Sequence, residues 1–331
     1  MLWRVSSFLI PGLLFAQASV AQVALRPGDI IVADTDTAGT LGGLIRVDPA
    51  TGAQTNISSG GLFRGPNGVA LSRGMLFATD PTASPDFMAA VVRVNPDTGA
   101  QAYLATGGAL RHVAGILAEP DGTLVVGDPF AFDGTGGLFR IDPVTGAQTV
   151  ITSRGFLETP VGIARAGAGN YLVADTHALG TGAVVRVEAA TGAQTIFASG
   201  GQFAAPTGIV LGGGAEIFVS DRDALGGNGA VIRLDRVTGV QTVISAGGNF
   251  IDPNGLALGA DGFLMVSDAR RGILRVNPVT GSQTILSSGG LFANPAGITV
   301  VTDVIPEPAL GILGLTFVAA AMRWSRAPVG G

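Results

Sequence analysis

Several residue types that carry chemistry are missing from this chain of 331 residues. It has no cysteine, so it can form no disulfide and offers no thiol nucleophile or thiolate metal ligand. All 19 basic residues are arginine, which excludes Schiff-base catalysis by a lysine amine. The net charge of −5 argues against a nucleic-acid-binding protein, because phosphate binding needs a basic face. Aromatic residues make up only 6%, few for a carbohydrate platform built on stacking.

Glycine is abundant instead, at 52 residues, and it marks the turns of an internal repeat. Each copy reads V-A-D-T, G-x-x-x-R-V-D-P-x-T-G-x-Q-T, S-G-G-x-F and P-x-G-I, with small variations, and one copy is shorter than the rest. The strand arginine of the six copies is Arg46, Arg93, Arg140, Arg186, Arg233 and Arg275. A period in the forties with about four short strands per copy is typical of a β-propeller blade. Six copies predict an all-β, six-bladed β-propeller with four-stranded blades over residues 28–303.

The order of strands also predicts how the ring closes. The domain begins with a V-A-D strand, Ile30 to Ala33, and ends with a P-x-G-I strand, Pro295 to Val300. The last inner strand has no successor in sequence, so it can pair only with the first strand of the domain. We therefore expect one blade of three N-terminal strands and one C-terminal strand, which removes exposed sheet edges.

The repeated run P-x-G-I, V-A-D-T and R-V-D-P-x-T-G resembles the NHL repeat and the six-bladed propellers that include gluconolactonase and regucalcin. It also resembles the seven-bladed streptogramin lyases, although this chain has one blade fewer. The resemblance covers all six copies and implies the fold. It does not by itself imply an activity, because one fold hosts many functions.

Both ends of the chain have the sequence features of targeting signals. Residues 1–21 read as a secretory signal peptide, with Arg4 as the positive region, an apolar stretch from Val5 to Phe15 and small residues for cleavage. Residues 304–331 contain Pro306, Glu307 and Pro308, an uncharged stretch at 309–322, and an Arg-rich end at 323–331. Fourteen apolar residues give roughly 21 Å of helix, short of the roughly 30 Å hydrocarbon core.

This three-part tail resembles the PEP-CTERM sorting signal of Gram-negative bacteria, which ends in a short hydrophobic helix and an Arg-rich segment. The resemblance covers the last 28 residues or so. It implies recognition by an exosortase, a membrane-embedded transpeptidase, through the motif Pro306-Glu307-Pro308 and the basic residues Arg323 and Arg326. We expect transient membrane insertion of the hydrophobic helix, with the body of the protein outside the cytoplasm.

Six aspartates, one per copy, follow the V-A-D strands, and the expected connectivity places all of them on one end of the ring. They are Asp34, Asp80, Asp128, Asp175, Asp221 and Asp268. A residue repeated in every blade usually holds the blade, so we expect these carboxylates to accept N–H groups of the loops. The alternative is a cation site near the axis, because oxygen ligands suit hard metals. For the strand arginines we expect ion pairs between adjacent blades.

Residues that differ between copies are the better candidates for chemistry. His112 and His177 are the only histidines, on neighbouring blades and on the same end of the ring. They predict either ordinary loop residues or, in an enzyme, a general acid/base pair or metal ligands beside Asp128 or Asp175. Streptogramin lyases are thought to use histidine on such a face, but this chain lacks their His-x-x-x-Glu type of cluster.

The lactonase resemblance implies a different site. Gluconolactonase and regucalcin hold a divalent cation near the axis with one Glu, two Asn and one Asp. In this chain the candidates for the asparagine roles are Asn67 and Asn254, one step into the Pro-Asn-Gly motif, although asparagine before glycine is also ordinary turn chemistry. A Ca²⁺ or Mg²⁺ ion would be the cofactor in that case.

Two functions follow from these patterns. The first is a secreted, monomeric, non-enzymatic binding or scaffold protein without a cofactor, displayed at the outer surface, in the periplasm or in the exopolysaccharide matrix of a Gram-negative bacterium. Its partners would be an exosortase and a protein or polysaccharide ligand. The second is a metal-dependent lactonase-like hydrolase or a streptogramin-lyase-like enzyme on the same propeller.

Overall fold

A computed structural model describes residues 24–84, 86, 88–167, 169–214 and 216–302. The expected signal peptide at residues 1–21 lies outside these residues. The tail lies outside them as well, including Pro306, Glu307, Pro308, the hydrophobic helix at 309–322, Arg323 and Arg326. Within the described part of the chain, no helix has the length and apolar character needed to cross a membrane.

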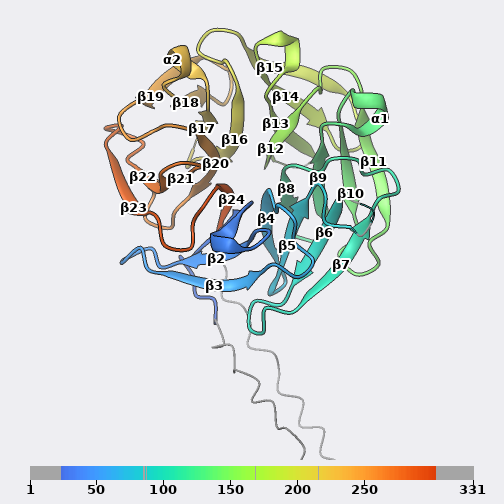
Figure 1. Ribbon diagram of the computed structural model, residues 1–331. Helices are drawn as coiled ribbons and strands as arrows, with labels where there is room; N and C mark the ends of the chain where they lie inside the picture. The colour runs from blue at the N-terminus through green and yellow to red at the C-terminus, as the bar shows by residue number, and fades with distance from the viewer. Residues whose placement is uncertain (1–23, 85, 87, 168, 215, 303–331) are drawn as a thin grey trace, which may run out of the picture.

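Six four-stranded antiparallel sheets surround a central axis, so the predicted six-bladed propeller is confirmed (Figure 1). The strands nearest the axis are β4 (Gly68–Ser72), β8 (Ile116–Ala118), β12 (Pro160–Arg165), β16 (Pro206–Leu211), β20 (Pro253–Leu258) and β24 (Pro295–Val300). Each of them packs against the inner strands of the two neighbouring blades.

The other three strands of each blade follow in chain order. The second strands are β1 (Ile30–Asp34), β5 (Met75–Asp80), β9 (Leu124–Asp128), β13 (Asn170–Asp175), β17 (Glu216–Asp221) and β21 (Leu264–Asp268). The third strands are β2 (Gly43–Val47), β6 (Ala90–Val94), β10 (Gly137–Ile141), β14 (Ala183–Glu188), β18 (Ala230–Asp235) and β22 (Gly272–Val276). The outer strands are β3 (Gln54–Ser59), β7 (Gln101–Thr106), β11 (Gln148–Ser153), β15 (Gln194–Ser199), β19 (Gln241–Ala246) and β23 (Gln283–Ser287).

The core of the molecule lies between neighbouring blades. All five residues of β1 and of β9 are buried, because the second strand is covered by another sheet on each face. This explains why these strands are continuous apolar runs rather than alternating ones. One cluster joins Leu44 and Ile57 of blade 1 to Leu76 and Val92 of blade 2.

The ring closes as predicted. Strand β24 pairs antiparallel with β1, with Ile30 opposite Val300 and Val32 opposite Ile298. Beyond the strands, the Gly28 N–H donates to the Val301 carbonyl at 2.7 Å and the Val301 N–H to the Asp29 carbonyl at 2.8 Å. Blade 1 is therefore built from three N-terminal strands and one C-terminal strand.

A glutamine at the start of every outer strand fastens its blade to the preceding one. Between blades 1 and 2, the Gln101 side chain donates to the Ser58 hydroxyl at 2.8 Å and to the Gly60 carbonyl at 3.1 Å. Its carbonyl oxygen accepts the Leu62 N–H at 2.6 Å. Equivalent bonds are made by Gln54, Gln148, Gln194, Gln241 and Gln283, so every interface is bridged, including the closing one.

The D-P-x-T-G turn between the third and outer strands is stabilised by its first side chain. In blade 3, Asp142 Oδ1 accepts the N–H groups of Val144 at 2.9 Å and Thr145 at 2.7 Å. Gly146 ends the turn with φ at +72°, and a side chain there would also meet the Leu104 carbonyl of blade 2. The turn therefore shapes its own blade and fits closely against the preceding one.

We expected the strand arginines to form ion pairs between adjacent blades. In the described part of the chain, this prediction is wrong, because the ion pairs of these arginines lie within one blade. Arg46 pairs with Asp29 at 2.5 Å, Arg233 with Glu216 at 3.1 Å, and Arg275 with Asp261 at 2.7 Å. In each case both residues belong to one blade, because the third strand runs beside the segment that opens the second strand.

Among the described residues, four short helical turns lie in the loops between the second and third strands. They are η1 (Thr37–Gly39), α1 (Ala131–Gly134), η2 (Ala178–Gly180) and α2 (Ala224–Gly227). We call the end of the ring that carries these loops and the six aspartates the loop face. The opposite end is the terminus face, because Gly28 and Val301 lie there.

Candidate functional site at the mouth of the central tunnel

A small pocket occupies the axis at the loop face. Its volume is about 100 Å³, and every blade contributes the same three positions to its lining, in the inner strand or directly before it. The first position differs between blades, as Asn67, Ala114, Val161, Thr207, Asn254 and Ala296. The second is always glycine, and at Gly162 a side chain would meet the Thr207 carbonyl of the next blade. The glycines therefore let the six inner strands approach closely and narrow the tunnel.

Hydroxyl groups behind the pocket bind its wall together. The Ser220 hydroxyl donates to the Asn254 carbonyl of the next blade at 2.6 Å, and Thr79 and Ser267 donate to the Ala114 and Ala296 carbonyls in the same way. The Thr207 hydroxyl also donates to the Asn254 carbonyl, at 2.9 Å. Because the donor and the acceptor of each bond belong to neighbouring blades, these hydrogen bonds link one blade to the next.

The six repeated aspartates are fully buried at the ends of the second strands. The Asp175 carboxylate accepts the N–H groups of Glu158 at 2.8 Å, Thr159 at 2.9 Å and Ala178 at 2.9 Å. Its partners thus come from both loops that meet at the loop face. Asp34, Asp80, Asp128, Asp221 and Asp268 accept N–H groups from the corresponding loops of their own blades. Backbone donors therefore occupy all six carboxylates.

Burial and backbone donors act on these carboxyl groups in opposite directions. Burial raises the pKa of Asp34, Asp175 and Asp221 above the ordinary aspartate value, and the N–H groups that they accept oppose this effect. The donors supply the local positive field that a buried carboxylate needs. Such a carboxylate has little remaining capacity to bind a cation from the tunnel.

The structure brings two predicted ligand residues together and separates them from the others. Asn67 and Asn254 both line the axial pocket, together with Thr207. Asp128 and Asp175 do not line it, and their carboxylates accept backbone N–H groups. No group of three or more histidine, aspartate or glutamate side chains in the described part of the chain is arranged to hold a metal ion.

The two histidines have separate surroundings. The His112 ring lies edge-on against Phe130, with ring centroids 4.9 Å apart, and burial lowers its pKa. The exposed His177 ring contacts the Thr159 hydroxyl through Nδ1 at 2.8 Å. Among the residues described, no hydrogen bond joins the two rings, and neither lines the axial pocket.

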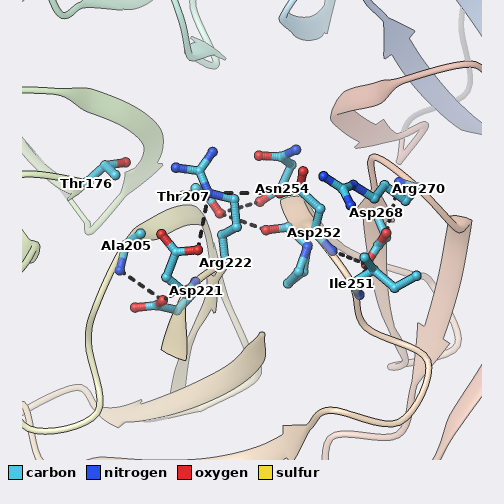
Figure 2. A network of polar contacts seen from close by, with 12 residues as sticks. Thr176, Ala205, Thr207, Asp221, Arg222, Ile251, Asp252, Asn254, Asp268 and Arg270 are labelled. Carbon is cyan, nitrogen blue, oxygen red and sulfur yellow. Dashed lines mark hydrogen bonds and ion pairs between the residues drawn. The ribbon is translucent and has the colours of Figure 1, made fainter. Parts of the chain in front are cut away.

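An ion-pair network not singled out from the sequence lies beside the pocket. Figure 2 shows Arg222 of blade 5 near Asp252 of blade 6, with Thr207 and Asn254 beside them. Arg222 Nε is 3.8 Å from an Asp223 oxygen and 3.9 Å from Asp252 Oδ1. Burial raises the pKa of Asp252, whereas Arg222 and Arg270 lower it. Arg222 and Asp252 occupy positions that vary between copies, and this variation was the available sequence signal.

A wider cavity of about 820 Å³ opens at the terminus face. Its wall is formed by the apolar ends of the inner strands, including Leu71, Ile163 and Leu258. At its rim Arg165 pairs with Glu119 at 2.8 Å. The axis thus has a small pocket of mixed polar and apolar lining at the loop face and a larger, mainly aliphatic cavity at the terminus face.

Comparison with known proteins finds a shared fold. No known protein family and no curated protein matches the chain. Among solved structures, one similar chain belongs to a nidogen/laminin complex, with 14% identity, a TM-score of 0.66, and coverage of 82% of this chain and 98% of that one. TolB from Acinetobacter baumannii matches with 14% identity and a TM-score of 0.61, covering 83% of this chain and 66% of that one. At this identity the likeness shows a propeller fold and nothing further.

Proposed function

We propose that this protein is an exported binding or scaffold propeller of a Gram-negative bacterium, sorted through its C-terminal tail by an exosortase. In this role it is a monomer and needs no cofactor. It presents its loop face to a protein or polysaccharide partner, at the outer surface, in the periplasm or in the exopolysaccharide matrix.

The observation that carries the proposal is the position of the two chain ends. Gly28 and Val301 are hydrogen-bonded neighbours on the terminus face, opposite the six aspartates. A leader before Gly28 and a tail after Val301 therefore both attach to the face opposite the variable loops. A propeller held by its tail is then oriented with its loop face toward possible partners.

The loop face also combines a fixed backbone with variable exposed residues, as binding surfaces do. Each buried aspartate ties together the two loops of its blade, so the backbone at the mouth is fixed while the exposed residues vary between blades. Fixed loops lower the entropy that a partner must remove on binding. This supports recognition as the role of the face.

The sorting role is tested by deleting residues 305–331 and following the protein by cell fractionation. We expect the shortened protein to fold and to be released into the medium. A second variant, Pro306→Ala with Glu307→Gln and Pro308→Ala, keeps the length of the tail and should also be missorted. Unchanged location of both variants would contradict the sorting role.

A metal-dependent, lactonase-like hydrolase is the second candidate. One observation favours it, namely that Asn67 and Asn254 both line the axial pocket. Their amide oxygens, with backbone carbonyls, suit Ca²⁺ or Mg²⁺. A melting temperature raised by either ion in the wild type and in Asn56→Ala, but not in Asn67→Ala/Asn254→Ala, would support this candidate. No shift in the wild type would reject it. For a streptogramin-lyase-like role of His112 and His177, the geometry offers no comparable support.

A further inference from the structure

Blade 6 differs from the other five blades in the loop after its second strand. The loops of blades 1 to 5 span residues 35–42, 81–89, 129–136, 176–182 and 222–229, whereas that of blade 6 spans only residues 269–271. A hollow of about 220 Å³ lies beside this short loop. We call it the blade-6 notch, and Arg270, Arg271, Ile285, Phe292 and Pro295 are among the residues that line it.

The short loop carries two arginines that form no direct ion pair in the part of the chain that the structure describes, although Arg270 is close enough to Asp252 to lower the pKa of that carboxyl group. Arg270 and Arg271 are both exposed, and the described residues place no carboxylate within ion-pair distance of either guanidinium. The Asp268 carboxylate beside them accepts the N–H groups of both arginines, so it is engaged with the backbone. Arg222 of blade 5 lies on the same face (Figure 2), but its guanidinium is already close to the Asp223 and Asp252 carboxylates. Arg270 and Arg271 are therefore the arginines left for a ligand. Guanidinium groups recognise carboxylates with paired hydrogen bonds, which makes this sector suited to an acidic ligand.

Exposed aliphatic side chains lie in loops of blade 6 and of the two blades beside it. Leu225 of blade 5, Ile251 of blade 6 and Leu41 of blade 1 are 47%, 38% and 51% exposed. Leu225 has φ at +55°, an unfavourable backbone conformation for leucine, which costs about 1–2 kcal/mol. Phe132 and Leu179 have the same conformation in the corresponding loops of blades 3 and 4, so it belongs to this type of loop. Aliphatic groups bury apolar side chains of a protein partner, whereas sugar rings stack on aromatic faces. Among the described residues that line the notch, Phe292 is the one aromatic residue and is half-buried, so this sector favours a protein ligand.

We infer that the blade-6 notch and its surroundings bind an acidic segment of a partner protein, in which carboxylates alternate with apolar side chains. The carboxylates pair with Arg270 and Arg271, and the apolar side chains pack on Leu225 and Ile251. This inference rests on the proposed binding function and assigns it a partner class and a site.

The test uses the full-length protein in detergent and a fluorescein-labelled peptide of alternating glutamate and leucine, with binding measured by fluorescence anisotropy. We expect the peptide to bind, and a matched peptide of lysine and leucine not to bind. Arg270→Gln/Arg271→Gln should raise the Kd about tenfold or more. The control Arg154→Gln/Arg236→Gln removes the same charge elsewhere and should leave the Kd within about twofold. Leu225→Asn tolerates the positive φ but removes the aliphatic group, and should also weaken binding.

Three results would overturn the inference. The first is no binding of the glutamate peptide to the wild type, and the second is an equal loss in both double variants, which would indicate only general charge attraction. The third is binding of polygalacturonate in preference to the peptide, lost in Arg270→Gln/Arg271→Gln, which would assign the notch to an acidic polysaccharide. Sorting of the same variants, followed by fractionation, is an independent readout, so failure at the notch is distinguishable from failure of the exported-propeller role.

Discussion

At the scale of single residues, the buried aspartates hold the loop face together. Asp175 accepts N–H groups from the loop before its inner strand and from the loop after its second strand. An aspartate in the same place in every copy was visible in the sequence, and so was its expected backbone role. The residues that meet at the mouth were not, because Arg222 and Asp252 are brought together only by the curvature of the ring.

The substitution Asp175→Asn tests how much this carboxylate contributes to the stability of the fold. An amide has one acceptor oxygen and would turn its NH₂ group toward backbone donors, so we expect a loss of about 2–3 kcal/mol in the free energy of unfolding. Urea denaturation is the measurement, with Asp133→Asn as the control because Asp133 is an exposed loop residue. Equal stability of the two variants would show that the aspartate is not a bracing residue.

The role of the repeated glutamines could not be predicted from the sequence. Glutamine stands at the same place in all six copies, although an outer strand has no need of a polar residue there. The signal was present, but a bond to the preceding blade depends on the distance between blades, which the repeat alone does not give. The structure supplies it, with Gln101 bonded to Ser58 and Leu62 of blade 1.

At the scale of elements, the turns between third and outer strands follow the sequence closely. Two copies begin the turn with Asn95 or Asn277, and both make the same backbone bonds that Asp142 and Asp235 make. Turn chemistry is local, so residues close in sequence were sufficient to predict it. The short loop of blade 6 was visible as a short copy, but the notch beside it depends on which neighbouring segments border the gap.

These turns predict an acid-dependent loss of stability. The N–H groups of Thr51, Thr145 and Thr238 lower the pKa of Asp48, Asp142 and Asp235 below the ordinary aspartate value. Because the folded pKa is depressed, the stabilisation is complete above the ordinary value and is lost as the pH falls through the folded value. The triple variant Asp48→Asn/Asp142→Asn/Asp235→Asn keeps the turn and removes the titration.

Urea denaturation between pH 6 and pH 3 measures the effect. We expect the wild type to lose more stability than the triple variant as the pH falls below about 4. Asp97→Asn is the control, because Asn95 already opens that turn. Parallel pH profiles for the wild type and the triple variant would show that the turn carboxylates do not contribute to the acid-dependent loss of stability.

At the scale of the whole molecule, the pairing of β24 with β1 joins the six blades into a closed ring. Strand order was sufficient to predict the pairing of β1 with β24, because a ring leaves the last inner strand no other partner. The repeat also predicted the number of blades. The location of a binding surface could not be predicted in the same way, because it depends on the residues in which the blades differ.

Removing the closing strand should therefore affect more than one blade. A chain ending at residue 294 lacks β24 and leaves β1 as an open edge, so we expect loss of the cooperative melting transition and aggregation. A chain ending at residue 304 keeps β24 and should melt like the full-length protein in differential scanning calorimetry. Similar transitions in the two shortened chains would show that closure contributes little.

The central claim, an exported propeller whose loop face is turned outward, is most directly tested by labelling in intact cells. The chain has no cysteine, so a single Leu225→Cys substitution on the loop face gives one unique thiol, on a side chain 47% exposed. A small charged maleimide that passes the outer membrane but not the inner membrane should label this protein in intact cells of the proposed Gram-negative host, and deletion of residues 305–331 should move the labelled protein into the medium. Labelling only after the cells are broken open would contradict the account.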